Sequence, residues 1–467
     1  MAVAHNHERH EGECFRAHRN GIATGATTVG TTTTADTYRE PRKQEKEASE
    51  AHHAYRRNPL LQDSTTQMQR QEMTHNEFEP SATIDDFIEK IRRWYEEDYQ
   101  GFRTMYDAAV ENVKPLPDDT PDEVSYDWRN NTIEDLCNFF RSWYEWKPGV
   151  HDGLNYIEMF SWLSYENDYG MVFFTSGPGY QMTAEFTELQ GQYMDSPDSL
   201  PLVKAWEDQL GQSMDDYVIP PEGFKNFNEF FARAVKPGKR PIDAPDDKSV
   251  VVAPADCVIN MIVDELTETT PIPVKTVTMN VKELLGDSPY ADKFIGGTAV
   301  SCILMPDMYH CYHAPVEGKV VESRDDVGGI YYGMRDFPDL LNKGDVGYGY
   351  DYSMFDNFRR GYLVIDTEDL DRGHVGMVPV GLNSIASVQF LEKFKSVSRP
   401  QRVPVDKGEK IGFFKYGGSL NILLFEKGRF PALRLHQGQR IGHFESKETS
   451  LGLFSGSWRT PSRRRRF

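Results

Sequence analysis

The sequence predicts an α+β protein in which a mainly helical region precedes a β-rich region. Large apolar residues recur at helical spacing between residues 81 and 215. From about residue 216 onward, short β-branched runs alternate with Gly, Pro and Asp turns. Residues 1–80 lack apolar periodicity and predict a disordered tail rich in His and Thr, and residues 451–467 predict a basic C-terminal tail. We therefore expect a helical domain over 81–215 and a β-rich domain over 216–450.

Two stretches predict the start of an amphipathic helix. Thr83 and Asp86 have capping-box spacing, and so do Thr132 and Asp135. An apolar stripe with helical spacing follows each threonine. The stripes are Ile84, Phe87, Ile88, Ile91, Trp94 and Tyr95 in the first, and Ile133, Leu136, Cys137, Phe140, Trp143 and Tyr144 in the second. Both stripes are expected to form core.

In the second half, we expect strands over residues 250–252, 299–305, 375–380 and 420–425, where apolar runs are bounded by turn residues. Residues 406–409, Asp-Lys-Gly-Glu, stand between two apolar segments and predict a hairpin turn that leads into residues 411–414.

Composition excludes several classes of protein. With 52 Lys and Arg against 72 Asp and Glu, the net charge of −20 argues against nucleic acid as a partner. The five cysteines have no CxxC spacing, so neither a disulfide framework nor a structural zinc site is expected. No apolar run approaches the roughly 20 residues of a membrane-spanning helix, and the N-terminus lacks the order of a secretory signal. We expect a cytoplasmic protein, either soluble or in peripheral contact with a membrane.

Three stretches of the β-rich half place reactive side chains among turn formers. They contain Asp256, the pair His310 and His313, and Ser419, which follows two glycines. Each also has a structural interpretation: an Asx turn, two packed histidines and a tight turn. Histidines three residues apart, with no cysteine pair to complete the ligands, do not favour a metal site. Asp256, His313 and Ser419 supply the acid, base and nucleophile of a triad, although spacing does not show that they meet.

Taken together and in order, these stretches resemble the phosphatidylserine decarboxylase family, whose members are pyruvoyl-dependent. The resemblance extends over about residues 220–445. It is carried by the entry segment, which comprises 227–233 and 236–242, the aspartate motif 254–256, the double-histidine motif 309–318 and the Gly-Gly-Ser self-cleavage motif 417–419.

The resemblance implies that Ser419 attacks the Gly418 carbonyl, with His313 as base and Asp256 orienting it. The chain would cut itself between Gly418 and Ser419, and Ser419 would become a pyruvoyl group, so that neither an external cofactor nor a metal is needed. The pyruvoyl carbonyl would form a Schiff base with the substrate amine and accept the electrons released as carbon dioxide leaves. His310 would assist decarboxylation or protonation. A homo-oligomer of cleaved protomers is also implied.

The family's usual reaction converts phosphatidylserine to phosphatidylethanolamine. Two residues depart from the family pattern, because Cys257 follows the aspartate in place of Gly and Leu420 follows the serine in place of Thr. The helical region resembles that of soluble relatives that decarboxylate free aromatic amino acids such as tryptophan, which makes such an amino acid an alternative substrate. A second alternative is an uncleaved, non-catalytic binding protein.

Overall fold

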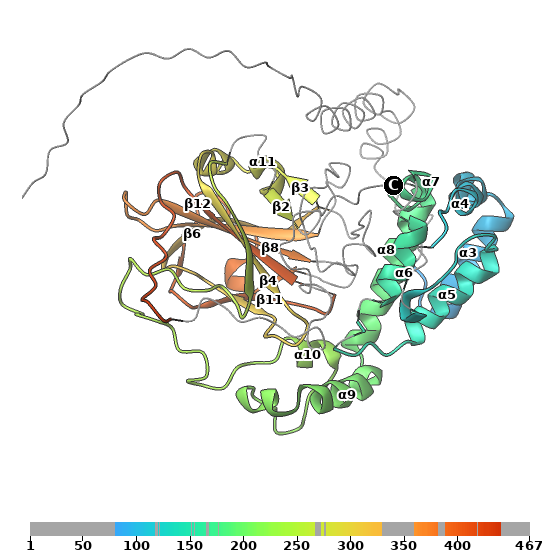
Figure 1. The fold of residues 1–467 in the computed structure, drawn as a ribbon, viewed down its shortest axis with the longest axis horizontal. Coiled ribbons are helices and arrows are strands. Elements are labelled where there is room, and N and C mark those ends of the chain that lie inside the picture. Colours follow the sequence, from blue (N-terminus) through green and yellow to red (C-terminus); the bar gives the residue numbers. More distant parts are fainter. Residues whose placement is uncertain are drawn as a thin grey trace, which may run out of the picture. The chain divides into compact units, whose positions relative to one another are not determined.

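The computed structural model describes residues 80–439, except for 117–119, 121, 151, 154, 165–167, 176, 267–271, 275–276, 329–358, 382–387 and 418 (Figure 1). The basic C-terminal tail and, apart from Pro80, the predicted N-terminal tail lie outside these residues. Most described helices precede the strands along the chain. The prediction of an α+β fold with its helices mainly in the N-terminal half is confirmed.

The first part of the described chain is built from helices, and two of them begin at the positions that the capping-box spacing predicted. Thr83 caps α3 and Thr132 caps α5, and each forms the complete capping box with Asp86 or Asp135. The helices are α3 (Ile84–Glu96), α4 (Phe102–Glu111), α5 (Ile133–Glu145), α6 (Asn155–Ser164), α7 (Asp168–Thr175), α8 (Gly177–Asp195), α9 (Leu200–Leu210), α10 (Phe227–Phe231) and α11 (Val281–Leu284).

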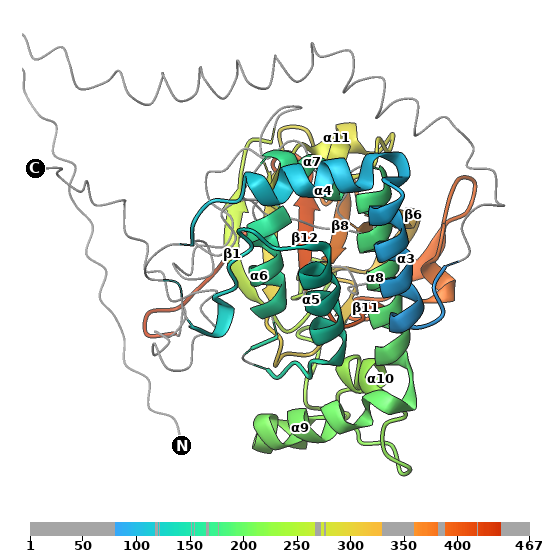
Figure 2. The ribbon, with the colours of Figure 1, turned by 90° about the vertical axis from the view of Figure 1, so that its right-hand side faces the viewer.

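An aromatic core joins helices α3 to α8, which lie close together in Figure 2. The predicted stripes supply most of its members on α3 and α5, and rings from the other helices complete it. Phe140 of α5 packs against Phe186 of α8 with ring centroids 4.6 Å apart. The buried indole of Trp128 donates a hydrogen bond to the Met159 carbonyl at 2.7 Å. Rings of this size bury large apolar areas and supply much of a core's stability.

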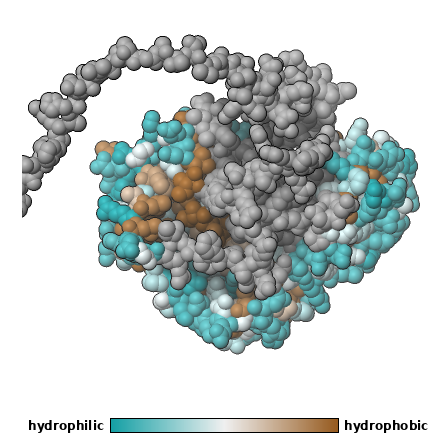
Figure 3. Space-filling view, in the orientation of Figure 1, coloured by the Kyte–Doolittle hydropathy of each residue, from teal (hydrophilic) through white to brown (hydrophobic). Residues whose placement is uncertain are grey.

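The β-rich part is centred on a seven-stranded antiparallel sheet in the order β1-β4-β12-β8-β7-β6-β10. Its inner strands are buried along nearly their whole length, which explains their continuous apolar runs. Figure 3 shows apolar residues gathered over part of the strand region in that view. The strands are β1 (Val258–Val263), β4 (Thr298–Leu304), β6 (Gly318–Val327), β7 (Arg360–Asp366), β8 (His374–Gly381), β10 (Val403–Val405) and β12 (Ser419–Phe425).

A smaller sheet packs against one face of the large sheet. It contains β5 (Cys311–His313), β11 (Lys410–Phe414) and β9 (Val388–Phe390), with β11 in the middle. One core cluster combines side chains of both sheets, and a second covers the opposite face of the large sheet together with α11. A separate two-stranded ribbon pairs β2 (Ile272–Val274) with β3 (Val277–Met279).

Three predicted strands are confirmed as β4, β8 and β12, but two expectations were wrong. Residues 250–252 form no strand, although the Val252 amide donates to the Pro315 carbonyl at 3.0 Å. Residues 406–409 do form a turn, in which Gly408 has φ +79°. The turn is not a hairpin, because β10 before it pairs with β6 in the large sheet and β11 after it pairs with β5 and β9 in the small sheet.

The N-cap of α5 gives a test of this part of the fold. The change Thr132→Ala removes the hydroxyl that accepts the Asp135 amide, so we expect the free energy of unfolding to fall by about 1 kcal/mol. Thr132→Ser keeps the hydroxyl and is expected to retain most of that stability. Urea unfolding followed by helical circular dichroism measures both. Equal midpoints for Thr132→Ala and the unchanged protein would contradict the capping role.

Candidate active site

Ser419 is the first residue of β12, and it lies between two neighbouring strands of the large sheet. Its register partners are Leu304 on β4 and Gly381 on β8. Side chains alternate along a strand, so Ser419 and Asn421 share the face that packs against the small sheet, while Leu420 belongs to the core on the opposite face. The Ser419 side chain is buried, and its Oγ finds no hydrogen-bond partner among the described residues.

The connection from β11 to β12 links Ser419 to the double-histidine segment. At the end of β11, the Phe414 amide donates to the His310 carbonyl at 2.9 Å. The chain then crosses from the small sheet to the large one through Gly417, whose φ of +134° suits only glycine. Gly418, the predicted cleavage residue, lies outside the described residues. Backbone pairing therefore anchors His310 and Ser419 at the two ends of one short connection.

His310 lies in a dry, aromatic environment. Its ring stacks on Phe231 of α10, with ring centroids 3.8 Å apart and planes inclined by 24°. The side chain is buried, and neither ring nitrogen has a hydrogen-bond partner among the described residues. Burial lowers the pKa of His310 well below its ordinary value, and the nearby positive charge of Arg233 lowers it further. The imidazole is therefore neutral at neutral pH.

His313 is held by hydrogen bonds at both ring nitrogens. Its Nδ1 lies 2.9 Å from the Gly408 carbonyl oxygen, and its Nε2 lies 3.0 Å from the Tyr309 hydroxyl. A carbonyl oxygen can only accept, so Nδ1 carries the proton and Nε2 of the neutral ring accepts from Tyr309. Burial lowers the pKa of His313, while the bond to Gly408 opposes the shift. This tautomer leaves Nε2 as the basic nitrogen.

Asp256 lies near His313 but is bound to a different partner. Its two carboxylate oxygens accept from Arg240, with Nε to Oδ1 at 2.9 Å and Nη2 to Oδ2 at 2.8 Å. The same turn reaches the histidine through its backbone, because the His313 amide donates to the Pro254 carbonyl at 2.7 Å. The charge of Asp256 also raises the pKa of His313 slightly against the effect of burial. The Nδ1 position that a triad aspartate would occupy is filled by Gly408.

The two departures from the family pattern have clear places in the structure. The Cys257 thiol hydrogen-bonds to Cys302 of β4, the register partner of Asn421. Leu420 is fully buried in the core on the face opposite Ser419.

Several residues of the site were not predicted individually. Tyr309 and Arg240 lie inside the motifs quoted above. Their side chains can form hydrogen bonds, and that property was the signal that could have identified them as site residues. Gly408 contributes through its backbone carbonyl, which no side-chain pattern reveals. The buried Asn421 side chain has no hydrogen-bond partner among the described residues, although it lies only two residues beyond Ser419.

Arg233 is also buried, and it borders the His310 environment. Its guanidinium lies 4.0 Å from the centroid of the Tyr217 ring, and it donates to the Asp307 carbonyl at 3.2 Å. Burial lowers the pKa of Arg233. The positive charge of this buried side chain lowers the pKa of His310 and so strengthens the preference of the imidazole for its neutral form.

Two features are absent from the part of the chain that the structure describes. Among the described residues, no three or more His, Cys, Asp or Glu side chains gather as a metal site requires. Within the same part of the chain, no helix has both the length and the apolar character needed to cross a membrane.

This set of described groups has the chemical character needed for proton transfer at a serine hydroxyl, and no hydrogen bond joins Ser419 Oγ to either histidine within it. It combines a serine hydroxyl without a partner, a histidine with a defined basic nitrogen and a second histidine kept neutral by burial. Such groups suit nucleophilic attack by the serine and general acid–base work by the histidines.

Comparison with known proteins gives consistent matches. The sequence model of a family described as "Phosphatidylserine decarboxylase" matches residues 227–445. A phosphatidylserine decarboxylase proenzyme of Fusobacterium nucleatum is 30% identical over 239 residues, which cover 51% of this chain and 72% of the relative. One of Clostridium perfringens is 30% identical over 275 residues, covering 55% and 85%.

A plant relative is longer. Phosphatidylserine decarboxylase proenzyme 2 of Oryza sativa is 30% identical over 267 residues, and the chain spans only 39% of its length. The two bacterial relatives are matched over most of their length, and the matched family segment contains Asp256, His310, His313 and Ser419. The chain therefore belongs to the phosphatidylserine decarboxylase family of carboxy-lyases.

Proposed function

We propose that the chain is a self-cleaving enzyme that converts phosphatidylserine to phosphatidylethanolamine and carbon dioxide. It would cut its backbone between Gly418 and Ser419 and carry a pyruvoyl group derived from Ser419. Membership of the family supports the reaction. The observation that carries the proposal is the buried Ser419 hydroxyl without a partner, placed at the end of the connection that is anchored to His310.

The first step is attack by Ser419 Oγ on the carbonyl carbon of residue 418. The bond from that carbon to the Ser419 nitrogen breaks, the nitrogen takes up a proton, and an ester replaces the peptide. Removal of the Ser419 α-proton then expels the residue 418 carboxylate and leaves a dehydroalanine. Water hydrolyses it with loss of ammonia, and a keto group remains at the new N-terminus.

His313 is the proposed base for this sequence. The Gly408 carbonyl keeps the proton on Nδ1, so the lone pair is at Nε2. In the structure, the Tyr309 hydroxyl donates a hydrogen bond to that lone pair. For His313 to act as base, this hydrogen bond must break, or the Tyr309 hydroxyl must relay the proton from Ser419 to Nε2. Asp256 is the proposed orienting residue, and because Gly408 occupies Nδ1 it would act through its charge and through its turn, in which the Pro254 carbonyl accepts from the His313 amide. Arg240 in turn fixes the Asp256 carboxylate.

The residues around Ser419 fit a pyruvoyl group. A planar keto group there needs polar partners in a dry site, and the His310 ring nitrogens and the Asn421 amide are buried polar groups without partners. When present, the pyruvoyl group supplies an electron sink for the pair released as carbon dioxide leaves. His310 is the proposed carrier of the proton that replaces carbon dioxide on the substrate carbon. Because burial keeps its ring neutral, it would take up that proton only during the reaction and pass it on readily.

The self-cleavage proposal is tested by the intact mass of the purified protein under denaturing conditions. We expect the unchanged protein to yield a C-terminal fragment of residues 419–467, because Ser419 Oγ is the attacking atom. Ser419→Ala removes only that oxygen and should remain a single full-length chain. A variant cut like the unchanged protein would refute the site. Two uncut chains would instead favour the non-catalytic binding protein.

The pH dependence of self-cleavage tests His313 as base. The base must be neutral, and its lowered pKa keeps it neutral down to pH values below about 6.5, the ordinary histidine value. We therefore expect a rate that is constant from about pH 6.5 to 8 and falls only at lower pH. Full-length chain made by cell-free translation and then shifted to each pH gives the rate. A midpoint above about 6.5 would contradict a buried histidine base.

A further inference from the structure

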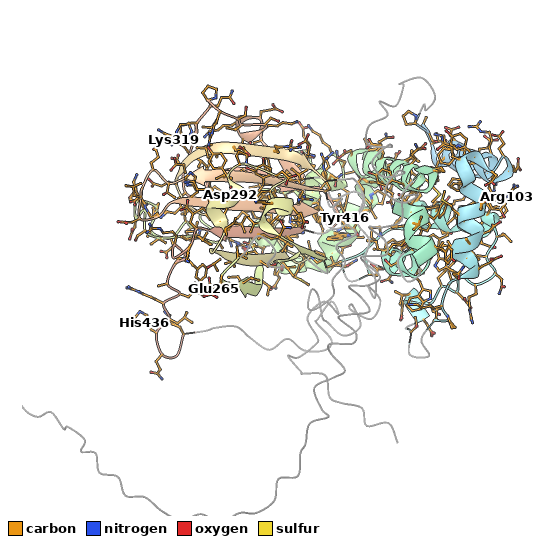
Figure 4. All side chains as sticks on the ribbon, turned by 90° about the horizontal axis from the view of Figure 1, so that it is seen from above. Arg103, Glu265, Asp292, Lys319, Tyr416 and His436 are labelled. Carbon is orange, nitrogen blue, oxygen red and sulfur yellow. The ribbon has the colours of Figure 1, made fainter. Side chains whose placement is uncertain are left out.

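The segment just before the proposed cleavage point contacts residues of helices α8, α9 and α10. Residues 415–417 follow β11, and the sheet pairing of β11 ends at Phe414. The Tyr416 amide therefore needs a partner outside the sheet. It donates to Asn228 Oδ1 of α10 at 3.0 Å. In Figure 4, Tyr416 lies where helices and strands meet.

Asn228 is itself fixed by α8. Its Nδ2 donates to Oδ1 of Asp195, the last residue of α8, at 3.0 Å. The other carboxylate oxygen of Asp195 accepts from Lys415 Nζ at 2.6 Å. Asp195 thus binds the segment twice, directly through Lys415 and indirectly through Asn228. We define the clamp as Asp195 and Asn228 acting on Lys415 and Tyr416.

The Tyr416 side chain adds a second point of attachment. Its ring packs edge to face against Trp206 of α9 and Phe227 of α10, with ring centroids 6.0 Å and 5.5 Å away. Its hydroxyl donates to the Gly153 carbonyl at 3.2 Å. A Cβ on residue 153 would lie only 2.7 Å from that hydroxyl oxygen, so glycine permits the approach.

Most of these groups lie outside the segment that defines the family. The family match begins at residue 227, so Gly153, Asp195 and Trp206 precede it. The region from which they come has no part in the chemistry described above. Its contacts converge instead on the residues that lead directly into the bond between 418 and 419.

We infer that Asp195 and Asn228 are positioning residues for self-cleavage, and that this clamp between α8 and α10 holds the chain before the scissile bond. The inference rests on the proposed self-cleavage. Attack by Ser419 requires the carbonyl of residue 418 to be presented at a defined distance and angle, and small misplacements of a reacting group reduce rates strongly. Asn228 is the main element, because the Lys415 ion pair is partly exposed and exposed pairs contribute little.

The test measures the first-order rate of conversion of full-length chain into the two fragments after cell-free translation. We expect Asn228→Ala, which deletes the acceptor for the Tyr416 amide, to slow cleavage by about tenfold or more. The matched control is Asn226→Ala. Asn226 caps the same helix and donates to the Asp195 backbone, but its hydrogen bonds do not reach residues 415–417. Its cleavage rate is expected to stay within about threefold of the unchanged protein.

A swapped pair separates positioning from folding. In Asp195→Asn with Asn228→Asp, the amide and carboxylate exchange places, so their mutual hydrogen bond and an acceptor for the Tyr416 amide are both kept. We expect this double variant to recover a rate within about threefold of the unchanged protein. Urea midpoints of all variants, measured on the uncleavable Ser419→Ala background, report stability independently of cleavage.

Each outcome decides between the two proposals. If the unchanged protein is not cut at Ser419, the self-cleavage proposal fails and the clamp fails with it. If the unchanged protein is cut and Asn228→Ala is cut equally fast, only the clamp is overturned. Equal slowing by Asn226→Ala and Asn228→Ala, or no recovery in the swapped pair, would also overturn the clamp and leave Asn228 with a structural role alone.

Discussion

The pairing of β12 with β4 on one side and β8 on the other is the constraint on which the site depends. It places Ser419 at the start of an inner strand and directs its side chain toward the small sheet. Because β11 belongs to the small sheet, the connection between β11 and β12 must cross from one sheet to the other. The bond from Phe414 to His310 ties that crossing to the histidine segment. Backbone pairing thus holds the His310 segment and Ser419 at the two ends of one connection.

Burial of polar groups without partners is the second feature of the site. A buried polar group without a hydrogen-bond partner typically lowers the free energy of unfolding by about 1–3 kcal/mol. Among the described residues of the site, three side chains are buried without a hydrogen-bond partner: Ser419 at Oγ, His310 at both ring nitrogens and Asn421 at its amide. A fold retains such groups where the chemistry needs them, because a dry site strengthens electrostatic interactions and keeps His310 neutral. The fold's stability therefore depends on the apolar cores on both faces of the sheet and on the aromatic core of the helices.

Local features of the fold were predictable from the sequence, and long-range pairings were not. Capping boxes at Thr83 and Thr132 involve residues three apart, so both helix starts were predicted correctly. The turn at 406–409 was also recognised, but the hairpin was wrong because partner choice depends on strands distant in sequence. The same limit applies to the site. The motifs of the site singled out His313, but they did not show its hydrogen-bond partner Gly408, which lies 95 residues away in the sequence. Likewise, Asn228 lies 188 residues from Tyr416, whose amide it binds.

Release of carbon dioxide is the direct measure of whether this site decarboxylates phosphatidylserine, as proposed above. The purified protein is incubated with vesicles containing phosphatidylserine labelled at the serine carboxyl, and in parallel with free tryptophan labelled at its carboxyl. We expect labelled carbon dioxide from the vesicles, little from tryptophan, and none from either substrate with Ser419→Ala. Release from tryptophan alone would assign the site to a free amino acid, and release that survives Ser419→Ala would rule out Ser419 as the source of the reactive group.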